Sequence, residues 1–364
     1  MNYIQNIFMK KIIICVFVLF SFLHAQEDSL IFRNIITLTV NDVESQGKTG
    51  TCWSYATGSF LESELVRMGK GEYNLSEMFV ARNVYLEKAE NYVRRHGKTN
   101  FGEGSLSHDL INTINKYGLV PNSIFNGLVD DLDKHDHSEL ASLLESYLKT
   151  IISKKKPSNL WKDGYGSILD VYLGKVPDSF EFEGNSYTPL EFAKYLEIES
   201  SDYINLSSFT HHPFYEYFIL EVPDNWSNGK FFNIPIEEMV EIVKSALKNG
   251  FSIAWDTDVS NDGFDSKKGL ASVDIEVSQE LRQLHFDNYT VTDDHLMHIT
   301  GFAEGSDGLV YFLVKNSWGD SRGMENYKGY IWVSETYFEL NTISIMLHKE
   351  ALSKKQLKKI KNKF

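Results

Sequence analysis

The stretch from Gln46 to Met68 constrains the fold of this chain more than any other. It begins as a short loop that contains glycine and continues with a helical pattern. Apolar side chains recur every three or four residues on one helical face: Trp53, Ala56, Phe60, Leu61, Leu65 and Met68. Gly69 supplies a C-terminal stop. The pattern predicts an amphipathic helix that starts near Cys52 and buries one face.

This placement puts Cys52 at a helix N-terminus, where unpaired N–H groups and the helix dipole favour a thiolate. Gly47 and Gly50 allow the preceding loop to turn tightly, so that Gln46 can fold back toward the sulfur. A side-chain amide in that position is suited to stabilising an oxyanion. The alternative is a buried, inert thiol, because free cysteine is among the most buried residue types.

A thiol nucleophile requires a base, and the base requires a partner that orients it. Among the 11 histidines, His295 opens a strand pattern that reaches Gly301, and His298 follows three residues later. Side chains alternate along a strand, so only one of the two is expected to face the thiol. We predict that His295 is the base and that His298 is structural.

The segment Val314-Lys-Asn316-Ser-Trp318-Gly offers the orienting partner. The Asn316 side-chain oxygen can accept from the imidazole N–H and hold the ring toward sulfur. Trp318 can shield that hydrogen bond from water. Alone, this segment is also compatible with an ordinary turn at the end of a strand.

The Gln46 to Trp53 segment, the spacing from His295 to Gly301 and the Asn316-Ser-Trp318-Gly segment together resemble the papain-like cysteine peptidases. Further segments are similar to the bleomycin hydrolase and aminopeptidase C branch of that family. They are Glu103-Gly104, Leu110 to Pro121, His212-Pro213, Asn233 to Ile236, Trp255 with Asp258, and Asp294-His295.

The resemblance implies an α+β, two-lobe papain-like fold and removal of N-terminal residues from peptides. It implies catalysis by Cys52, His295, Asn316 and Gln46, and substrate binding by Gly104, Ser105 and Trp318, with no metal or cofactor. Known members form hexameric rings, so the resemblance implies a homo-oligomer, and specifically a hexamer, as an expectation for this chain. Ser105 stands where many relatives have a second glycine, which departs from their geometry for the substrate backbone.

Domain organisation is predicted as follows: a signal peptide over residues 1–25, a peptidase domain over 26–352 and a basic tail over 353–364. Two lysines precede a short apolar run at the N-terminus, which is typical of export to the periplasm or outside the cell, and an uncleaved membrane anchor is the alternative. Cleavage removes Cys15 and leaves Cys52 as the one thiol. We expect no membrane association after cleavage.

Helical patterns precede strand patterns, which is typical of two lobes with a cleft between them. Residues 130–200 are rich in polar residues and predict a mainly helical insertion, with strands near 179–187.

Without residues 1–25 the formal charge changes from −14 to −16, which argues against nucleic-acid binding. The partial calcium-loop spacing from Asp258 to Gly263 lacks its bidentate Glu, so we predict a turn there.

In relatives, a C-terminal arm in the cleft enforces aminopeptidase action, whereas this tail contains six lysines from Lys354 to Lys363. We expect a cysteine aminopeptidase that depends only partly on its tail. Two alternatives remain open: an endopeptidase on the same fold, and a catalytically weak protein that binds peptides or assembles with partners.

Overall fold

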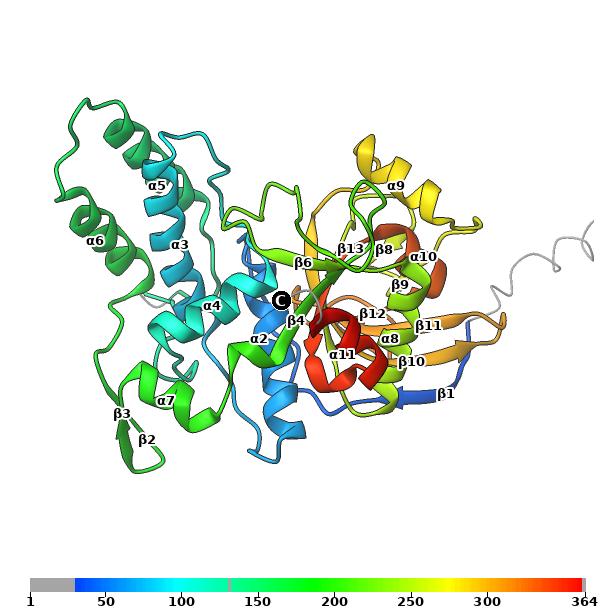
Figure 1. Cartoon of the computed structure of the whole chain (residues 1–364). Coiled ribbons are helices and arrows are strands. Elements are labelled where there is room, and N and C mark those ends of the chain that lie inside the picture. Colours follow the sequence, from blue (N-terminus) through cyan, green and yellow to red (C-terminus); the bar gives the residue numbers. More distant parts are fainter. Residues whose placement is uncertain (1–29, 130–131, 362–364) are drawn as a thin grey trace, which may run out of the picture.

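The chain forms two lobes with one helix between them in the computed structural model, which describes residues 30–129 and 132–361 (Figure 1). The predicted signal peptide lies outside the described residues. Helix α2, Cys52–Arg67, lies between a helical lobe and a lobe built on a large sheet. The helical lobe contains α3 Glu77–Arg94, α4 Ser107–Tyr117, α5 Ser138–Ile152, α6 Trp161–Leu173, α7 Pro189–Leu196, the 3₁₀ turn Ser200–Asp202, and the hairpin of β2 Phe180–Phe182 and β3 Asn185–Tyr187.

The other lobe is organised by an 11-stranded, mostly antiparallel sheet in the order β5-β6-β4-β13-β7-β10-β11-β12-β9-β8, with β1 paired to β10. Its strands are β1 Phe32–Thr37, β4 Tyr203–Ser207, β5 Tyr217–Ile219, β6 Lys230–Asn233, β7 Ile253–Thr257, β8 Phe264–Asp265, β9 Leu270–Ala271, β10 His295–Gly305, β11 Val310–Lys315, β12 Tyr330–Ser334 and β13 Thr342–His348. Its helices are α8 Ile236–Lys248, α9 Gln279–Asp287, α10 Glu335–Asn341, the 3₁₀ turn Lys349–Ala351 and α11 Lys354–Lys361.

The two faces of the central strands contact different cores, because side chains alternate along each strand. Ala254 and Leu296 belong to the core shared with α2 and the helical lobe. Trp255 and Met297, their neighbours in sequence, belong to the core that α8 covers. The sheet therefore has one face toward α2 and the opposite face toward α8.

Helix α2 differs from the amphipathic helix that the sequence predicts. Every residue from Cys52 to Leu65 is buried, polar ones included. The polar side chains are tolerated because they are paired: Ser54 donates to the Glu77 carbonyl, and Glu62 accepts from the Leu75 amide. The prediction of a single buried face is thus wrong, since both lobes pack on this helix.

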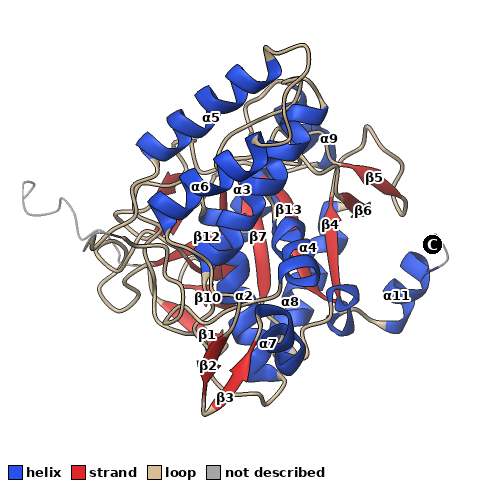
Figure 2. Ribbon diagram, turned by 90° about the vertical axis from the view of Figure 1, so that its left-hand side faces the viewer, coloured by secondary structure: helices blue, strands red, loops and turns tan. Residues whose placement is uncertain are grey.

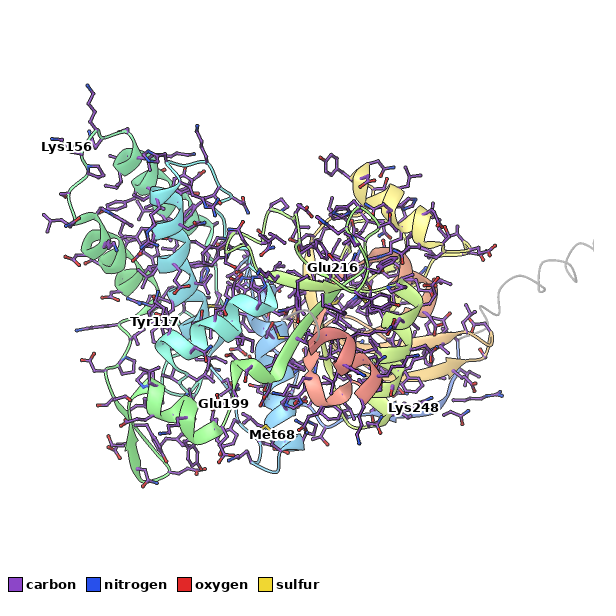
Figure 3. All side chains as sticks on the ribbon, viewed as in Figure 1. Met68, Tyr117, Lys156, Glu199, Glu216 and Lys248 are labelled. Carbon is purple, nitrogen blue, oxygen red and sulfur yellow. The ribbon has the colours of Figure 1, made fainter. Side chains whose placement is uncertain are left out.

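Strand β1 ends at Thr37, and the segment after it crosses toward α2 as an extended loop. The expected helical insertion is present as α5, α6 and α7 with the β2–β3 hairpin. Lys156 lies at the outer tip of this insertion, between α5 and α6 (Figure 3). Met68 follows the last residue of α2, at the end of the helix away from Cys52.

The basic tail forms α11, which packs on the lobe of the sheet. Lys359 pairs with Glu238 of α8 at 3.0 Å, and its ammonium group lies 3.9 Å from the centre of the Tyr215 ring. Figure 2 shows α11 at the edge of the molecule, separated from α2. Within the described residues, no helix combines the length and the apolar character needed to span a membrane.

Candidate active site

Cys52 is the first residue of α2, and a tight loop delivers it there. Gly47 has φ +63°, and a Cβ at this position would lie 2.3 Å from the His135 carbonyl oxygen, so a side chain does not fit. The Gly50 amide donates to the Glu103 carboxylate at 2.8 Å. These contacts fix the loop against the helical lobe and present the sulfur at the end of the helix.

The loop is also joined to the sheet by strand-like pairing. The Gln46 amide donates to the Ser317 carbonyl at 2.9 Å, and Ser45 pairs with Trp318 in an isolated antiparallel bridge. This pairing places the segment before the cysteine beside the segment that follows β11. Two parts of the chain 270 residues apart therefore meet at one point.

His295 begins β10, and its Nε2 lies 2.8 Å from Asn316 Oδ1. Asn316 Oδ1 also accepts the Ser317 amide at 2.7 Å, which fixes the orientation of the side-chain amide. His295 Nε2 must then carry the proton and donate it, because the oxygen has no hydrogen. Nδ1 is left as the basic nitrogen of the ring.

Trp318 covers this pair. Its ring stacks on His295 with centroids 4.7 Å apart and an interplanar angle of 29°. A stacked indole excludes water from the Asn316–His295 hydrogen bond, and a drier bond is electrostatically stronger. The geometry is that of an imidazole held in one tautomer and one orientation.

Burial pushes Cys52 and His295 toward their neutral forms. Desolvation raises the pKa of Cys52 to about 12, although the Leu296 backbone amide favours the thiolate; nearby Asp293, Asp224 and Asp256 oppose it. Desolvation also lowers the pKa of His295 to about 4, and the hydrogen bond to Asn316 acts in the opposite direction. Proton transfer from sulfur to imidazole creates both charges together, so each then stabilises the other.

Gln46 is buried and oriented by two contacts. Ser317 Oγ donates to its Oε1 at 2.7 Å, and its Nε2 donates to the Thr49 carbonyl at 2.6 Å. A primary amide has two N–H groups, so one donor remains for a further acceptor. The side chain is thus held rigidly at the loop that leads to Cys52.

Gly104 and Ser105 lie beside this loop but differ in what they can offer. A Cβ on Gly104 would lie 1.8 Å from Asp224 Oδ2, so the glycine permits a close approach of that carboxylate. The Ser105 hydroxyl donates to Asp109 at 2.6 Å and accepts the Trp226 indole N–H at 2.8 Å. Ser105 is 1% exposed, so its side chain is occupied within the protein.

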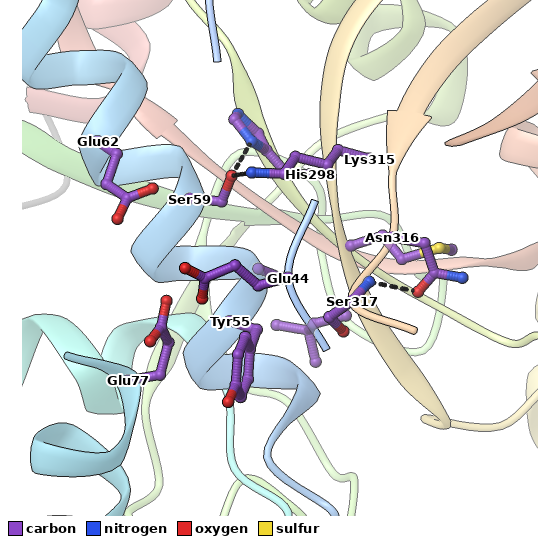
Figure 4. Close-up of a pocket in the computed structure, with 12 residues that line it drawn as sticks. Glu44, Tyr55, Ser59, Glu62, Glu77, His298, Lys315, Asn316 and Ser317 are labelled. Carbon is purple, nitrogen blue, oxygen red and sulfur yellow. Dashed lines mark hydrogen bonds between the residues drawn. The ribbon is translucent and has the colours of Figure 1, made fainter. Parts of the chain in front are cut away.

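His298 lies elsewhere, against Ser59 in the middle of α2 (Figure 4). Lys315 donates to Ser59 Oγ at 2.9 Å, so the hydroxyl hydrogen is free to donate to His298 Nδ1 at 3.0 Å. Burial and the charge of Lys315 hold the pKa of His298 well below its usual range. The polar cavity at this point has about 20 Å³ of accessible volume, which is room for one water molecule rather than a substrate.

Sequence reasoning missed three acids near the sulfur. Asp256 and Asp293 interact with one another through their side chains, and Asp224 projects from the loop before β6 toward Gly104. The pattern Asp293-Asp294-His295 draws attention to the carboxyls. The register of β7 against β10, which the sequence alone does not specify, brings Asp256 to them.

One group among the described residues has the ligand types for a metal: His211, His212 and Glu221. Gln283 Oε1 accepts the Thr210 amide at 2.6 Å, so its NH₂ group faces His211 Nδ1 at 3.0 Å. His211 then carries its proton on Nε2, which lies 3.1 Å from Glu221. A protonated nitrogen cannot bind a metal, so this group is explained by hydrogen bonds.

Comparison with known proteins identifies the family. The model of the Peptidase C1-like family matches residues 98–364, which include His295 and Asn316. The chain belongs to the Peptidase C1-like family. It is 23% identical to Aminopeptidase G of Lactobacillus delbrueckii subsp. lactis, over 88% of this chain and 83% of the relative. It is 24% identical to Aminopeptidase C of Streptococcus thermophilus, over 91% of this chain and 85% of the relative.

A solved structure agrees with the fold. PepW of Lactobacillus rhamnosis superposes with a TM-score of 0.75 at 22% identity, covering 90% of this chain and 84% of that chain. The expected α+β, papain-like fold is confirmed. The expected class, a cysteine peptidase with aminopeptidases among its relatives, is confirmed at the level of the family.

Proposed function

We propose that this chain is a cysteine aminopeptidase in which Cys52 is the nucleophile, His295 the general base and acid, and Asn316 the residue that orients His295. The hydrogen bond of 2.8 Å from His295 to Asn316, with its direction fixed by Ser317, is the observation that carries the proposal. The placement of the Leu296 amide against the Cys52 sulfur supports it, because Leu296 directly follows His295.

In the proposed reaction, His295 Nδ1 takes the thiol proton and Cys52 Sγ attacks the carbonyl carbon of the first peptide bond. The oxyanion accepts hydrogen bonds from the free Gln46 N–H and the Cys52 backbone N–H. The C–N bond then breaks, and His295 gives its proton to the leaving amine. Water, deprotonated by His295, attacks the thioester and releases the N-terminal amino acid and the free thiol.

The first experiment compares the wild type with Cys52→Ala. We expect the variant to lose hydrolysis completely while its melting temperature stays within a few degrees of the wild type, because one small atom is removed at a helix start. A thiol-directed epoxysuccinyl inhibitor should label Cys52 in a 1:1 ratio and abolish turnover. Turnover that persists in Cys52→Ala would place the chemistry at another residue.

The second experiment separates the two peptidase types. Peptides with free and with acetylated N-termini are digested side by side, and the products are identified by mass spectrometry. An aminopeptidase shortens the free peptides one residue at a time and spares the blocked ones. Internal cleavage of blocked peptides would instead identify an endopeptidase.

We further propose that the mature chain acts outside the cytoplasm after loss of residues 1–25. The basic and apolar N-terminal pattern and the single remaining thiol support export. N-terminal sequencing of protein from the exported fraction tests this proposal, and an intact N-terminus would contradict it. Light scattering of the same sample would measure whether the chain assembles as a homo-oligomer.

A further inference from the structure

An enzyme that removes N-terminal residues has to recognise the α-ammonium group, and this requirement rests on the proposed function. Bond lengths place that nitrogen about 2.5 Å from the carbonyl carbon that the sulfur attacks. A negative group for the ammonium is therefore needed close to Cys52, on the side of the cleft that receives the first residue.

Three residues in a row across the sheet define this side. Leu296 on β10 lies directly opposite Asp256 on β7, and Asp256 lies opposite Ser344 on β13. The row is on the face of the sheet that packs on α2. The Leu296 amide lies against the Cys52 sulfur, and adjacent strands are about 4.8 Å apart, so Asp256 is one strand away from the reacting atoms.

Asp256 has a second carboxyl beside it. Asp293, two residues before His295, interacts with it through the side chain, and Ser344 Oγ donates to Asp256 Oδ2 at 3.1 Å. Asp256 Oδ1 and Asp293 Oδ2 are both buried and have no conventional donor. Asp256 is 1% exposed, whereas Asp293 is partly exposed and connects the pair to solvent.

Two carboxyls whose side chains interact resist ionising together, so the pair retains one proton in the pH range where it carries one negative charge. Burial raises the pKa of Asp256 to about 7, and burial together with the charge of Asp256 also raises the pKa of Asp293. No ion pair to either carboxyl occurs within residues 30–129 and 132–361. The pair is thus a buried acidic group with no cation at ion-pair distance among the described residues, although the charge of Lys88 acts on Asp293 from further away.

We propose that the Asp256–Asp293 pair binds the α-ammonium group of the peptide substrate beside Cys52. The ammonium supplies the missing cation and donates to the carboxyl oxygens that lack a donor. A peptide with a blocked N-terminus brings no charge and places its acyl group against a buried carboxylate. The pair therefore selects free N-termini by attraction and disfavours blocked ones through the cost of desolvation.

Two other negative groups are less suited to this role. Asp224 lies beside Gly104, but Asn100 donates to it at 2.9 Å and the charge of Lys88 acts on it. Helix α11 is held by Glu238 of α8, on the opposite face of the sheet from Asp256, and the carboxyl terminus itself lies outside the described residues. The test below distinguishes ammonium binding by Asp224 or by the C-terminal segment from binding by the Asp256–Asp293 pair.

The test compares two substrates on five forms of the full chain. The substrates are the aminoacyl 4-nitroanilide that the wild type cleaves best and its des-amino analogue, which has hydrogen in place of the ammonium. The forms are the wild type, Asp256→Asn, Asp293→Asn, the double variant Asp256→Asn/Asp293→Asn, and Asp294→Asn as the matched control. Active-site titration with the epoxysuccinyl inhibitor, which has no ammonium, counts the folded sites.

For the wild type we expect kcat/KM to be roughly 10- to 100-fold higher for the free amine than for the des-amino analogue, as for other buried charged hydrogen bonds. Each single variant keeps one carboxylate and should retain most of this preference. The double variant should lose it, so that kcat/KM for the two substrates becomes about equal, whatever its absolute rate, because the two acids also act on the Cys52 thiolate, a step that both substrates share. Asp294→Asn, which removes an equal charge one residue away, should keep the preference.

A double variant that retains the full preference would overturn the proposal. So would loss of the preference in Asp224→Asn, or after removal of residues 353–364, with the pair intact. A wild type that shows no preference for free amines, or Cys52→Ala that stays active, would instead refute the proposed function. If the double variant fails to titrate, the double variant Asp256→Ser/Asp293→Ser takes its place, and loss or retention of the preference in that variant supports or overturns the proposal in the same way.

Discussion

Two buried polar layers lie between α2 and the sheet, and they differ in how their charges are balanced. The outer layer contains Cys52, Asp256 and Asp293 near the N-terminus of the helix, with His295 at the adjoining start of β10. The inner layer contains Ser59, Glu62, His298 and Lys315, about two turns further along the same helix (Figure 4).

The inner layer contains its own cation and is internally hydrogen-bonded. Lys315 donates to Ser59, and Glu62 accepts the Leu75 amide. In the outer layer no described lysine or arginine forms an ion pair with Asp256 or Asp293. Lys315 acts on Glu62 through its charge, as Lys88 acts on Asp293. Lys315 also donates a hydrogen bond within its layer, whereas Asp256 Oδ1 and Asp293 Oδ2 have no donor among the described residues. This difference is consistent with an outer layer that a ligand completes.

The largest expected effect separates the two histidines. His295→Ala should lower kcat/KM by about 10³-fold or more, because proton transfer to and from the sulfur loses its base. Its free energy of unfolding should fall by about 1–2 kcal/mol, because the buried ring and its stacking on Trp318 are lost. Steady-state kinetics corrected by active-site titration measures the first effect, and urea unfolding measures the second.

His298→Gln is the matched variant in the inner layer. The glutamine oxygen can still accept from Ser59, but the ring packing against Phe60 is lost, so we expect a destabilisation of about 1–2 kcal/mol with kcat/KM within a few-fold. An inactive His298→Gln beside an active His295→Ala would reverse the assignment of the two residues.

The sequence predicted part of each layer: three residues of the active site, and a structural role for His298 without its partners. Spacing alone suggested Cys52, His295 and Asn316, because each lies in a short segment with its own pattern. The partners of Ser59 come from β10 and β11, more than 230 residues away, and no local pattern encodes them. Asp256 depends likewise on strand register, since a shift of one residue would turn it toward α8.

Removal of Lys315, the cation of the inner layer, tests whether its charge stabilises the ionised form of Glu62. Lys315→Met should cost about 0.5 kcal/mol more free energy of unfolding at pH 8 than at pH 6, because Glu62, whose pKa is about 8, is half ionised at pH 8 and loses the charge that favours its ionised form. The cost should be smaller at pH 6, where Glu62 is neutral. Urea unfolding at both pH values measures this difference, and an equal cost at both would show that Lys315 acts through packing alone.

The free energy of unfolding of the wild type, measured as a function of pH, reports the protonation of acids in both layers without any mutation. Burial raises the pKa of Glu62 to about 8 and that of Asp256 to about 7, so between pH 6.5 and 8 the folded chain holds protons that the unfolded chain has released. The free energy of unfolding should therefore fall as pH rises through this window. His295, with its pKa lowered to about 4, contributes only below about pH 6.5.

Glu62→Gln should flatten this slope by on the order of 1 kcal/mol per pH unit, the value for one proton. The double variant Asp256→Asn/Asp293→Asn should flatten it separately, and the two effects should add because the layers are distinct. A slope that is unchanged in both variants would mean that neither layer retains its protons on folding.

The smallest effect is expected from the tail, which the sequence suggested as a partial block of the cleft. Lys359 and Ile360 attach α11 to the lobe of the sheet, through Glu238 and the core beneath α8. Deletion of residues 353–364 exposes that contact and should cost roughly 1 kcal/mol of stability, because one exposed ion pair and one buried isoleucine are lost. The ratio of free-amine to blocked-peptide cleavage should not change, since the Asp256–Asp293 pair lies on the opposite face of the sheet.

Lys359→Ala in the full chain serves as the control, because it weakens the attachment without removing the carboxyl terminus. A rise in blocked-peptide cleavage on deletion, but not in Lys359→Ala, would assign the selection of free N-termini to the tail rather than to the outer layer.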